Sequence, residues 1–424
     1  MRTIYSFLFF IFSIFYFPFF IFKGKHRSGL AERFGQLSSE NKKKLAGKKV
    51  YWVHAVSVGE VQLALRLIHT WRPLFKGAGY LLTTTTVAGY EVASKSIHPD
   101  DALSFFPMDF AWTVRSFIRA ASPAKVVMVE TEIWPNLICE LSNQGIPTYI
   151  MNGRISDRAI SKYRLVRFFL RGILSQLSGI GVQDELMRDR FVELGAPKEI
   201  VKITGNIKYD WQPPDREPAE IEEVKNSLRA VSTQWFLAAS THEGEEAAVF
   251  DMAEAIWQKH PKAGILIAPR HIHRVSAIEE LARQKGVALK KVFDEGKNDY
   301  DVKESKRVWL LDRMGWLAFL YEAMDIVFVG GSLAPIGGHN IVEPAFFAKP
   351  VLVGPHTENF LEMVSQFQKR EAVMQVRDAA DLRDKVLFLI DHPDERNRLG
   401  KAAQKVVREY GGALQKNTST FFVS

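Results

Sequence analysis

The feature that most constrains the fold is an alternation of short apolar runs with helical stretches, which occurs twice along the chain. The strand-like runs lie at 48–56, 79–86, 124–130, 146–153 and 179–183 in the first half, and at 234–240, 263–270, 287–293, 307–311, 325–332 and 350–354 in the second. Continuous apolar runs separated by helices are typical of parallel strands that helices cover on both faces. We therefore predict an α/β chain that contains two doubly wound, Rossmann-like domains.

A proline-rich segment separates the two series. The sequence "WQPPDREPAE" at 211–220 contains three prolines and several charges, and 424 residues are too many for one ordinary core. We predict an N-terminal domain at 26–211, a linker at 212–220 and a C-terminal domain at 221–424, whose last helix can pack back on the first domain. Ligands bind beyond the carboxyl ends of such strands, so we expect the domains to face each other across a cleft.

The first residues predict a membrane anchor at 1–25. From Ile4 to Phe22 the chain has no charged residue, which is long enough for one crossing of a bilayer. Basic residues are more frequent after this run than before it, which places the large domains in the cytoplasm by the positive-inside rule. Pro18 and two serines also allow a helix that lies in the membrane interface, and a buried helix of a soluble core is a further alternative.

Composition excludes several classes of protein. The single cysteine, Cys139, excludes a disulfide framework and a cysteine-based zinc site. The net charge of +8 favours acidic partners, but the chain has no nucleic-acid motif, so we expect no nucleic acid as a partner. Basic residues near the anchor suit an anionic bilayer surface, with a merely solvated basic face as the alternative.

The end of the first strand carries the segment "HAVSVGE", in which Ser57 stands three residues before Glu60. This spacing is that of a capping box, where serine and glutamate satisfy backbone N–H groups at a helix start. The other interpretation is that Glu60 accepts a proton from a substrate, and Gly59 beside it permits a close approach. The segment "WFLAASTHEGEE" repeats the pattern with Ser240, which indicates a second strand–turn–helix unit of the same kind.

Two further segments of the first half carry charge at places where ligands bind. The segment "VVMVETEIWPN" (126–136) ends a strand in two carboxylates, the first of them Glu130, and a helix dipole is the structural alternative that explains them. The segment "GNIKYD" (205–210) places Lys208 at the domain junction, where its ammonium group would face the cleft. An ordinary solvated lysine is the alternative.

In the second half, "DIVFVGGSLAPIGGHNIVEPAFF" (325–347) predicts a strand, a glycine-rich loop and a helix that starts near Asn340. Glycines allow a close ligand approach, and backbone N–H groups attract phosphate. Asn340 and Glu343 would share one helix face, either as ligand contacts or as a cap. Because the chain has no G-x-G-x-x-G sequence, we expect a nucleotide and not a dinucleotide.

The segment "APRHIHR" (268–274) places Arg270 just beyond a strand, where a guanidinium group can hold a phosphate. His271 and His273 would lie on opposite sides of an extended chain without a carboxylate partner. We therefore expect no metal site here.

Together, these segments resemble the Kdo (3-deoxy-D-manno-octulosonate) transferases of lipopolysaccharide synthesis over nearly the whole chain. The motifs follow the family order: the N-terminal anchor, "RFG", "HAVSVGE", "ETEIWPN", "NGRIS", "GNIKYD", "STHEGEE", "APRH", "GGS" with "GGHN" and Glu343, and "GPHTENF".

The resemblance implies a GT-B fold and an inverting transfer of Kdo from CMP-Kdo to a phosphorylated lipid A precursor, lipid IVA. It implies that Glu60 is the proton acceptor and that Glu130 and Lys208 support the transition state. No cofactor and no metal is expected, and the protein is expected at the cytoplasmic leaflet of the inner membrane.

The resemblance also implies which residues hold the substrates. The expected contacts to CMP are Pro269, Arg270, Met314, Gly315, Trp316, Asn340, Ile341, Val342 and Glu343. Further substrate contacts are expected at Ser57, Gly59, Ser240, Thr241 and His242. At Trp316 the family usually has glutamate, so a carboxylate contact to the nucleotide is missing from this chain.

Two other functions remain open on the sequence. One is another GT-B enzyme that uses a UDP-sugar, such as a lipid-linked glycosyltransferase or a sugar epimerase. The second is a membrane-tethered protein that binds a nucleotide or a lipid without turnover.

Overall fold

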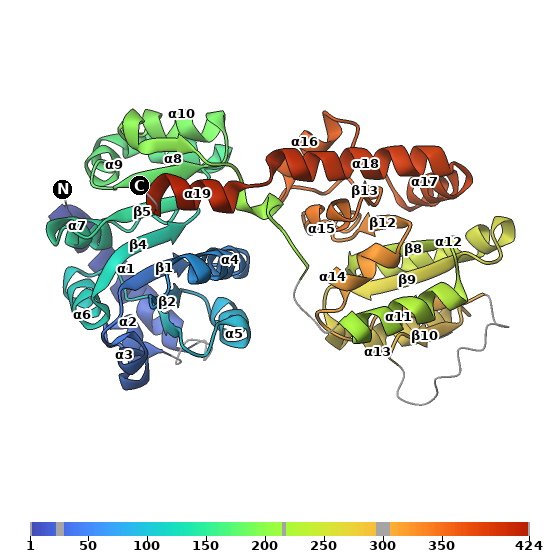
Figure 1. Cartoon of the computed structure of the whole chain (residues 1–424), viewed down its shortest axis with the longest axis horizontal. Helices are drawn as coiled ribbons and strands as arrows, with labels where there is room; N and C mark the ends of the chain where they lie inside the picture. The colour runs from blue at the N-terminus through green and yellow to red at the C-terminus, as the bar shows by residue number, and fades with distance from the viewer. Residues whose placement is uncertain (1, 23–28, 214–217, 294–305, 423–424) are drawn as a thin grey trace. The chain divides into compact units, whose positions relative to one another are not determined.

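The computed structural model describes residues 2–22, 29–213, 218–293 and 306–422, and it consists of two compact units (Figure 1). Unit 1 comprises Met1–Asp210 and Gly411–Ser424, and unit 2 comprises Trp211–Tyr410. The predicted linker, 212–220, falls partly on residues 214–217, which lie outside the described residues.

Unit 1 contains a seven-stranded parallel sheet in the order β3-β2-β1-β4-β5-β6-β7. Its strands are β1 (Val50–Ala55), β2 (Gly79–Thr84), β3 (Ala102–Phe105), β4 (Pro123–Val129), β5 (Thr148–Gly153), β6 (Gly179–Val182) and β7 (Val201–Ile203). Its α-helices are α1 (Arg2–Phe22), α2 (Leu30–Arg33), α3 (Ser39–Leu45), α4 (Val58–Leu74), α5 (Val87–Ser96), α6 (Ala111–Ala121), α7 (Pro135–Asn143), α8 (Asp157–Leu165), α9 (Arg167–Leu174), α10 (Glu185–Glu193) and α19 (Ala413–Phe422).

Unit 2 also contains a seven-stranded parallel sheet, in the order β10-β11-β9-β8-β12-β13-β14. Its strands are β8 (Trp235–Thr241), β9 (Gly264–Pro269), β10 (Leu289–Lys291), β11 (Val308–Leu310), β12 (Ile326–Val329), β13 (Val351–Val353) and β14 (Met374–Gln375). Its α-helices are α11 (Pro218–Val231), α12 (Glu245–Lys259), α13 (Val275–Gln284), α14 (Leu317–Leu320), α15 (Val342–Phe346), α16 (Leu361–Gln368), α17 (Ala379–Asp391) and α18 (Pro393–Tyr410).

The prediction of two parallel-sheet α/β domains is confirmed, and each predicted apolar run contains a strand. In β1 every residue is buried, because alternate side chains enter the cores on opposite faces of the sheet. Trp52 packs in the core with α6 and α7, whereas Tyr51 and Val53 pack in the core with α4 and α19. Burial on both faces explains why these strands read as continuous apolar runs.

In each unit the strand order reverses beside the first strand. In unit 1 the reversal lies between β1 and β4, and in unit 2 it lies between β8 and β12. Doubly wound sheets bind ligands at such a point, beyond the carboxyl ends of the strands. This edge of each sheet is therefore where the candidate site residues have to be sought.

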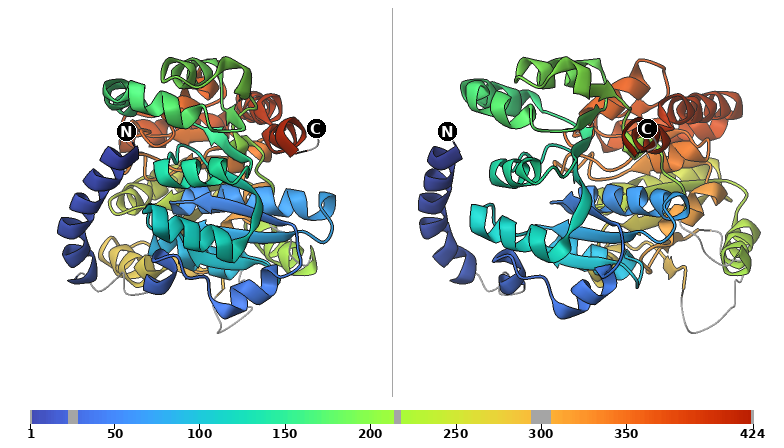
Figure 2. Two further views of the ribbon diagram at one scale, coloured as in Figure 1. Left: turned by 90° about the vertical axis from the view of Figure 1, so that its left-hand side faces the viewer. Right: turned by 60° about the vertical axis from the view of Figure 1, so that its left-hand side comes forward.

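The predicted membrane anchor is not supported. Within the described part of the chain, no helix combines the length and the apolar character that a membrane crossing requires. Instead, α1 lies along the outside of unit 1 (Figure 2), because its polar side chains bond to that unit. The Tyr5 hydroxyl donates to Asp109 at 2.9 Å, and Ser6 bonds to Asn136. The basic residues predicted to follow the anchor, Lys23 to Arg27, lie outside the described residues.

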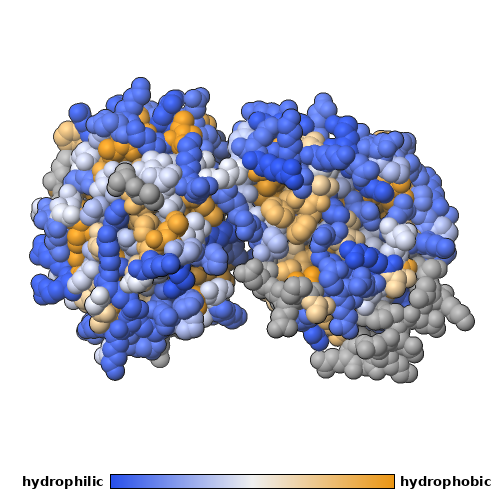
Figure 3. Space-filling model, in the orientation of Figure 1, coloured by the Kyte–Doolittle hydropathy of each residue, from blue (hydrophilic) through white to orange (hydrophobic). Residues whose placement is uncertain are grey.

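The opposite side of α1 is apolar and exposed. Its exposed residues recur at the spacing of one helical face: Ile4, Phe7, Leu8, Ile11 and Ile14, with Phe10 beside them. By contrast, the view in Figure 3 shows a surface in which hydrophilic residues predominate on both units.

The last helix, α19, belongs to unit 1 although the chain reaches it from unit 2. Phe422 stacks on Trp71 of α4 with ring centroids 4.6 Å apart, and the indole N–H of Trp71 donates to Thr418 at 2.8 Å. The Asp210 carboxylate accepts the backbone N–H groups of Gly412 and Leu414 at the start of this helix. The final residues thus complete the core beside β1.

Candidate functional site

Glu60 lies at the carboxyl edge of the unit 1 sheet, in the first turn of α4. The Glu60 N–H donates to Ser57 Oγ at 3.3 Å, and the Ser57 hydroxyl donates to Glu60 Oε1 at 2.8 Å. The second carboxylate oxygen, Oε2, accepts the Val56 N–H at 2.8 Å. The Ser57 cap is therefore present, and the glutamate reaches back one residue further than in a standard capping box.

The surroundings of Glu60 make its carboxylate a better proton acceptor. Burial raises the pKa of Glu60, and the negative charge of Glu130 raises it further, while the bonds from Val56 and Ser57 lower it. The balance is upward. A carboxylate with a raised pKa gains basicity near neutral pH, which suits general base catalysis.

Glu130 follows β4, the strand on the other side of the reversal point, and pairs with Lys208. The Lys208 Nζ lies 3.0 Å from Glu130 Oε1. Lys208 lies in a short 3₁₀ turn, η2 (Ile207–Tyr209), whose first N–H donates to the Asn152 side chain at 2.9 Å. Glu130, directly after β4, and Asn152, in the last residues of β5, both have φ of 61°, so the backbone turns sharply at the ends of these two strands.

Glu132 is a third carboxylate in this group, and sequence reasoning assigned it no role. Burial raises its pKa to about 7, and the charges of Glu60 and Glu130 add to the shift. The signal in the sequence was its place in "ETE", two residues after Glu130. Unit 1 thus brings together Glu60, Glu130 and Glu132, and Glu130 pairs with the cation Lys208.

At the carboxyl edge of the unit 2 sheet, the glycine-rich loop surrounds the buried carboxylate of Glu245. Glu245 has 2% of its surface exposed and accepts five backbone N–H groups at 2.7–3.1 Å. The donors are His242, Gly331, Ser332, Leu333 and Ala334. The N–H groups of 331–334 are therefore already bonded within the protein.

This arrangement corrects the expected repeat of Ser57 and Glu60. The pattern predicted a cap at Ser240 with Glu243 three residues later, but Ser240 lies within β8 and has φ of 54°. Helix α12 begins at Glu245, which reaches back to the His242 N–H. The strand–turn–helix unit is present, but two extra residues in the turn move the reaching glutamate from 243 to 245.

The next glutamate, Glu246, is also committed to internal contacts. It has no exposed surface and accepts the Thr241 hydroxyl at 2.8 Å. The Arg274 guanidinium donates to its two oxygens at 2.6 and 3.2 Å. Thr241 is fully buried in this contact, so its hydroxyl serves the fold of the turn.

Two histidines meet beside this turn. His242 Nε2 and His339 Nε2 lie 2.8 Å apart, and the rings are nearly parallel, with 13° between their planes. His271 packs edge-on against His242 with ring centroids 5.7 Å apart. Sequence reasoning selected His242 but not His339, which stands in "GGHN" and meets its partner only through the fold.

The prediction that His271 and His273 lie on opposite sides of an extended chain was wrong. The chain there is not extended but makes a 3₁₀ turn, η3 (Ile272–Arg274), so the two rings stack with centroids 5.4 Å apart. Within the described residues, no group of three or more His, Cys, Asp or Glu side chains is placed to hold a metal ion.

The remaining predicted nucleotide contacts are close to these histidines in the amino-acid sequence. Pro269 ends β9, and Arg270 follows it with an exposed side chain. The Asn340 amide donates to Glu343 at 3.2 Å and its oxygen accepts the Val342 N–H at 3.1 Å, so these residues share a helix start as predicted. Ile341 and Val342 are fully buried, so their side chains belong to the core.

In the segment Met314-Gly315-Trp316, the first side chain is exposed and the last is buried. Met314 has 66% of its surface exposed, and Gly315 has φ of 80°, a conformation that favours glycine. Trp316 is only 4% exposed and packs against Phe293 with ring centroids 4.5 Å apart. The indole that replaces the family glutamate is thus used in packing.

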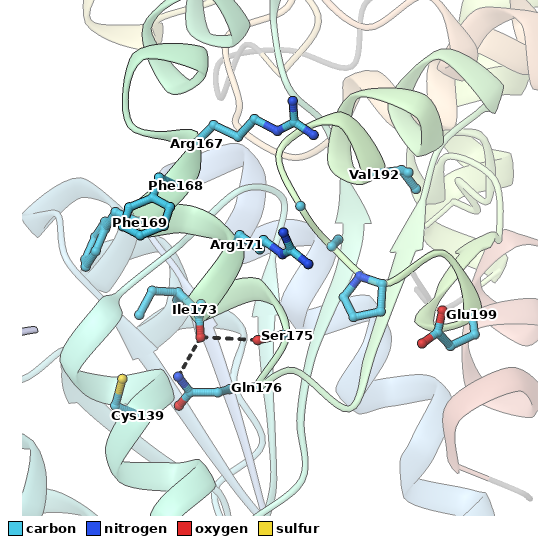
Figure 4. Close-up of a pocket in the computed structure, with 14 residues that line it drawn as sticks. Cys139, Arg167, Phe168, Phe169, Arg171, Ile173, Ser175, Gln176, Val192 and Glu199 are labelled. Carbon is cyan, nitrogen blue, oxygen red and sulfur yellow. Dashed lines mark hydrogen bonds between the residues drawn. The ribbon is translucent and has the colours of Figure 1, made fainter. Parts of the chain in front are cut away.

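A surface hollow lies elsewhere, beside α9 in unit 1 (Figure 4). Its volume is about 1020 Å³, and it is lined by residues that include Cys139, Arg167, Arg171 and Gln176. The Gly172 carbonyl there accepts the Gln176 amide at 2.7 Å. Helix α9 leads into the amino end of β6, so the hollow lies at the sheet edge opposite Glu60, and none of the predicted site residues lines it.

Comparisons with known proteins identify relatives that match most of the chain. Residues 28–211 match the family described as 3-deoxy-D-manno-octulosonic-acid transferase (kdotransferase). A 3-deoxy-D-manno-octulosonic acid transferase of Haemophilus influenzae is 34% identical over 394 residues, which cover 92% of this chain and 90% of that protein.

Solved structures show the same architecture at low sequence identity. A glycosyltransferase from Rickettsia africae has a TM-score of 0.56 at 13% identity, covering 88% of this chain and 98% of that one. The UDP-GlcNAc 2-epimerase from Neisseria meningitidis has a TM-score of 0.52 at 13% identity, covering 88% and 100%. These likenesses show a fold that resembles the GT-B glycosyltransferases, while the sequence relatives show more: the chain belongs to the 3-deoxy-D-manno-octulosonic acid (Kdo) transferase family of glycosyltransferases.

Proposed function

We propose that the protein transfers Kdo from CMP-Kdo to a phosphorylated lipid A precursor, lipid IVA, with inversion at the anomeric carbon and with Glu60 as the general base. The observation that carries this proposal is the setting of Glu60. Its carboxylate lies at the reversal point of the sheet, and burial together with Glu130 raises its pKa.

The chemistry needs one base on the acceptor side. A sugar hydroxyl is a poor nucleophile near neutral pH, so Glu60 takes its proton as the oxygen forms a bond to the anomeric carbon of Kdo. The bond between that carbon and the CMP phosphate breaks, and its electron pair leaves with CMP. A single direct displacement inverts the centre, whereas retention by double displacement would need a carboxylate nucleophile.

Lys208 and Glu130 support this step from the same unit. The ammonium group lies 3.0 Å from Glu130 and offers positive charge at the edge where the reacting groups meet. Glu130 in turn keeps a negative charge near Glu60 and so favours the protonated product form of the base.

Unit 2 holds the donor in this proposal. Within the described residues, the Arg270 guanidinium has no carboxylate at ion-pair distance, so its charge is available for the CMP phosphate. The N–H groups of 331–334 are bonded to Glu245 and do not serve the phosphate. The proposed nucleotide contacts remain Pro269, Arg270, the backbone of Met314 to Trp316, and Asn340 to Glu343, with Ser240 to His242 nearby.

We place the protein at the cytoplasmic face of the inner membrane. The exposed apolar side of α1 suits insertion into the membrane interface, which the sequence allowed as an alternative to a crossing. Such attachment brings the enzyme to a lipid acceptor without a membrane span.

The deciding experiment is mass spectrometry of the lipid product. The purified protein is given a tetra-acylated lipid A precursor with CMP-Kdo generated in situ, and in separate reactions with UDP-sugars. We expect a mass increase of whole Kdo units with CMP-Kdo alone. Transfer from a UDP-sugar, or binding of CMP-Kdo without any product, would contradict the proposal and favour one of the two alternatives.

A further inference from the structure

The contact between His242 and His339 limits how many protons the two rings can carry. Their Nε2 atoms lie 2.8 Å apart, so one must donate and the other must accept, and a single proton lies between them. Both rings cannot be protonated at Nε2 without losing this contact. The pair is therefore one unit that changes charge by one proton at a time.

Charged groups of both signs surround the pair. Arg270, His271 and Arg274 face it from the segment after β9, while Glu245 and Glu246 face it from α12. Glu245 is committed to five backbone N–H groups, and Glu246 to Arg274 and Thr241. Of these charged groups, Arg270 has no carboxylate partner among the described residues.

This environment favours the neutral form of both imidazoles. Burial lowers the pKa of His339 to about 4, and the charge of Arg270 lowers it further. Burial is also the main cause that holds the pKa of His242 below its usual value; Glu245 and Glu246 oppose it, while Arg274 and, least, Arg270 add to it. An anion placed beside the pair would oppose both effects, because it favours the charged imidazole by attraction and by accepting its hydrogen bond.

The glycine at 331 leaves room for this arrangement. A Cβ atom there would meet the His339 ring at 3.0 Å and the His242 ring at 3.4 Å, and the backbone has φ of 66°. His339 also precedes Asn340, whose side-chain oxygen accepts the Val342 N–H at the predicted nucleotide site.

We propose that the His242–His339 pair and Arg270 together hold the phosphate of the nucleoside monophosphate, and that the pair takes up one proton from solvent when this anion binds. The inference rests on the proposed function, because it identifies the anion as the phosphate of CMP. It adds His339 to the substrate-binding residues. A proton held there also stabilises the departing phosphate during transfer.

Isothermal titration calorimetry of the full chain with CMP tests this inference. Titrations at pH 7 in buffers of different ionisation enthalpy count the protons taken up, and we expect up to one for each CMP bound. CMP affinity should fall as pH rises from 6 to 8, by at most about tenfold for each pH unit. Cytidine, which lacks the phosphate, should bind without proton uptake.

The matched variants separate the pair from its neighbours. His339→Gln should weaken CMP binding about tenfold, which corresponds to one good hydrogen bond to a charged group, and should abolish proton uptake while leaving cytidine binding unchanged. His273→Gln, in the same segment as Arg270 but without contact to the pair, should behave as the unmodified protein.

CMP binding without proton uptake, or with equal affinity in His339→Gln, would overturn the inference while the donor assignment stands. Binding of UDP but not CMP, with one proton taken up, would retain the phosphate contact and overturn the proposed function. If His339→Gln does not fold, the proton count of the unmodified protein still decides.

Discussion

Glu60 and Glu245 occupy corresponding places in the two units and have different surroundings. Each lies at the start of the helix that follows the first strand of its sheet, beside the point where the strand order reverses. Glu60 accepts one backbone N–H and one hydroxyl and is partly exposed. Glu245 accepts five backbone N–H groups and is buried.

The difference shows that surroundings, and not topology, decide what such a carboxylate can do. Five donors satisfy the lone pairs of Glu245, so it serves as an internal anion that shapes the glycine-rich loop. Glu60 has fewer donors and a negatively charged neighbour, Glu130, so protonation of its carboxylate costs less. One glutamate organises its unit, and the other is suited to exchange a proton.

The largest expected effect is that of Glu60→Gln on transfer. The amide keeps the size of the side chain but cannot accept the proton, so we expect Kdo transfer to fall by about a hundredfold or more. CMP binding and the Tm should stay nearly unchanged, because unit 2 is untouched. Steady-state transfer assays and calorimetry check this, and activity close to that of the unmodified enzyme would remove Glu60 from the role of base.

Glu245→Gln should show the opposite pattern. Its amide nitrogen would face backbone N–H groups in a buried site, so we expect a loss of about 2 kcal/mol in the free energy of unfolding. Denaturant unfolding measures the loss, and CMP titration should show weaker binding because the 331–334 loop is no longer held. Glu243→Gln, two residues earlier and exposed, is the matched control. A stable Glu245→Gln protein with normal CMP affinity would break the comparison.

Glu132→Gln tests the carboxylate cluster around Glu60 through pH. The folded pKa of Glu132 is about 7, above the ordinary value of 4.5. Below pH 4.5 the carboxyl group is protonated in both the folded and the unfolded protein, so its burial costs no ionisation free energy. As pH rises from 4.5 through 7 the unfolded protein loses this proton first, and the free energy of unfolding falls. The glutamine has no such loss, so the Tm advantage of the variant should grow by about 2–4 °C between pH 5 and pH 8. A constant difference in Tm would mean that Glu132 is not held in the protonated form.

Gly59→Ala has the smallest expected effect on the fold. A Cβ at residue 59 would meet only Ser57 Oγ, at 4.0 Å, so alanine fits and should stabilise α4 by up to about 1 kcal/mol. If the acceptor approaches Glu60 closely, transfer should still fall several-fold through a higher KM. An unchanged KM in the more stable variant would show that no close approach occurs there.

Most of the fold followed from apolar runs, and the strands that did not are short. β3, β7 and β14 have four, three and two residues and lie at sheet edges, and β7 and β14 are only partly buried, so they do not form continuous apolar runs. Glu60, Glu130 and Lys208 could be selected from their segments and the family resemblance. The five donors of Glu245 come from residues distant in sequence, and the meeting of His242 with His339 spans 97 positions, so neither was visible in the chain.

The placement of α19 in unit 1 has a consequence for how the protein is made. Residues 1–210 emerge from the ribosome before unit 2 has been translated. At ordinary elongation rates, the helix that covers Trp71 follows roughly 10–40 s later. During that delay the aromatic surface of α4 is bare and open to chaperones and proteases. A message that stops early therefore yields a first unit without its cover, so degradation can distinguish truncated products from finished ones.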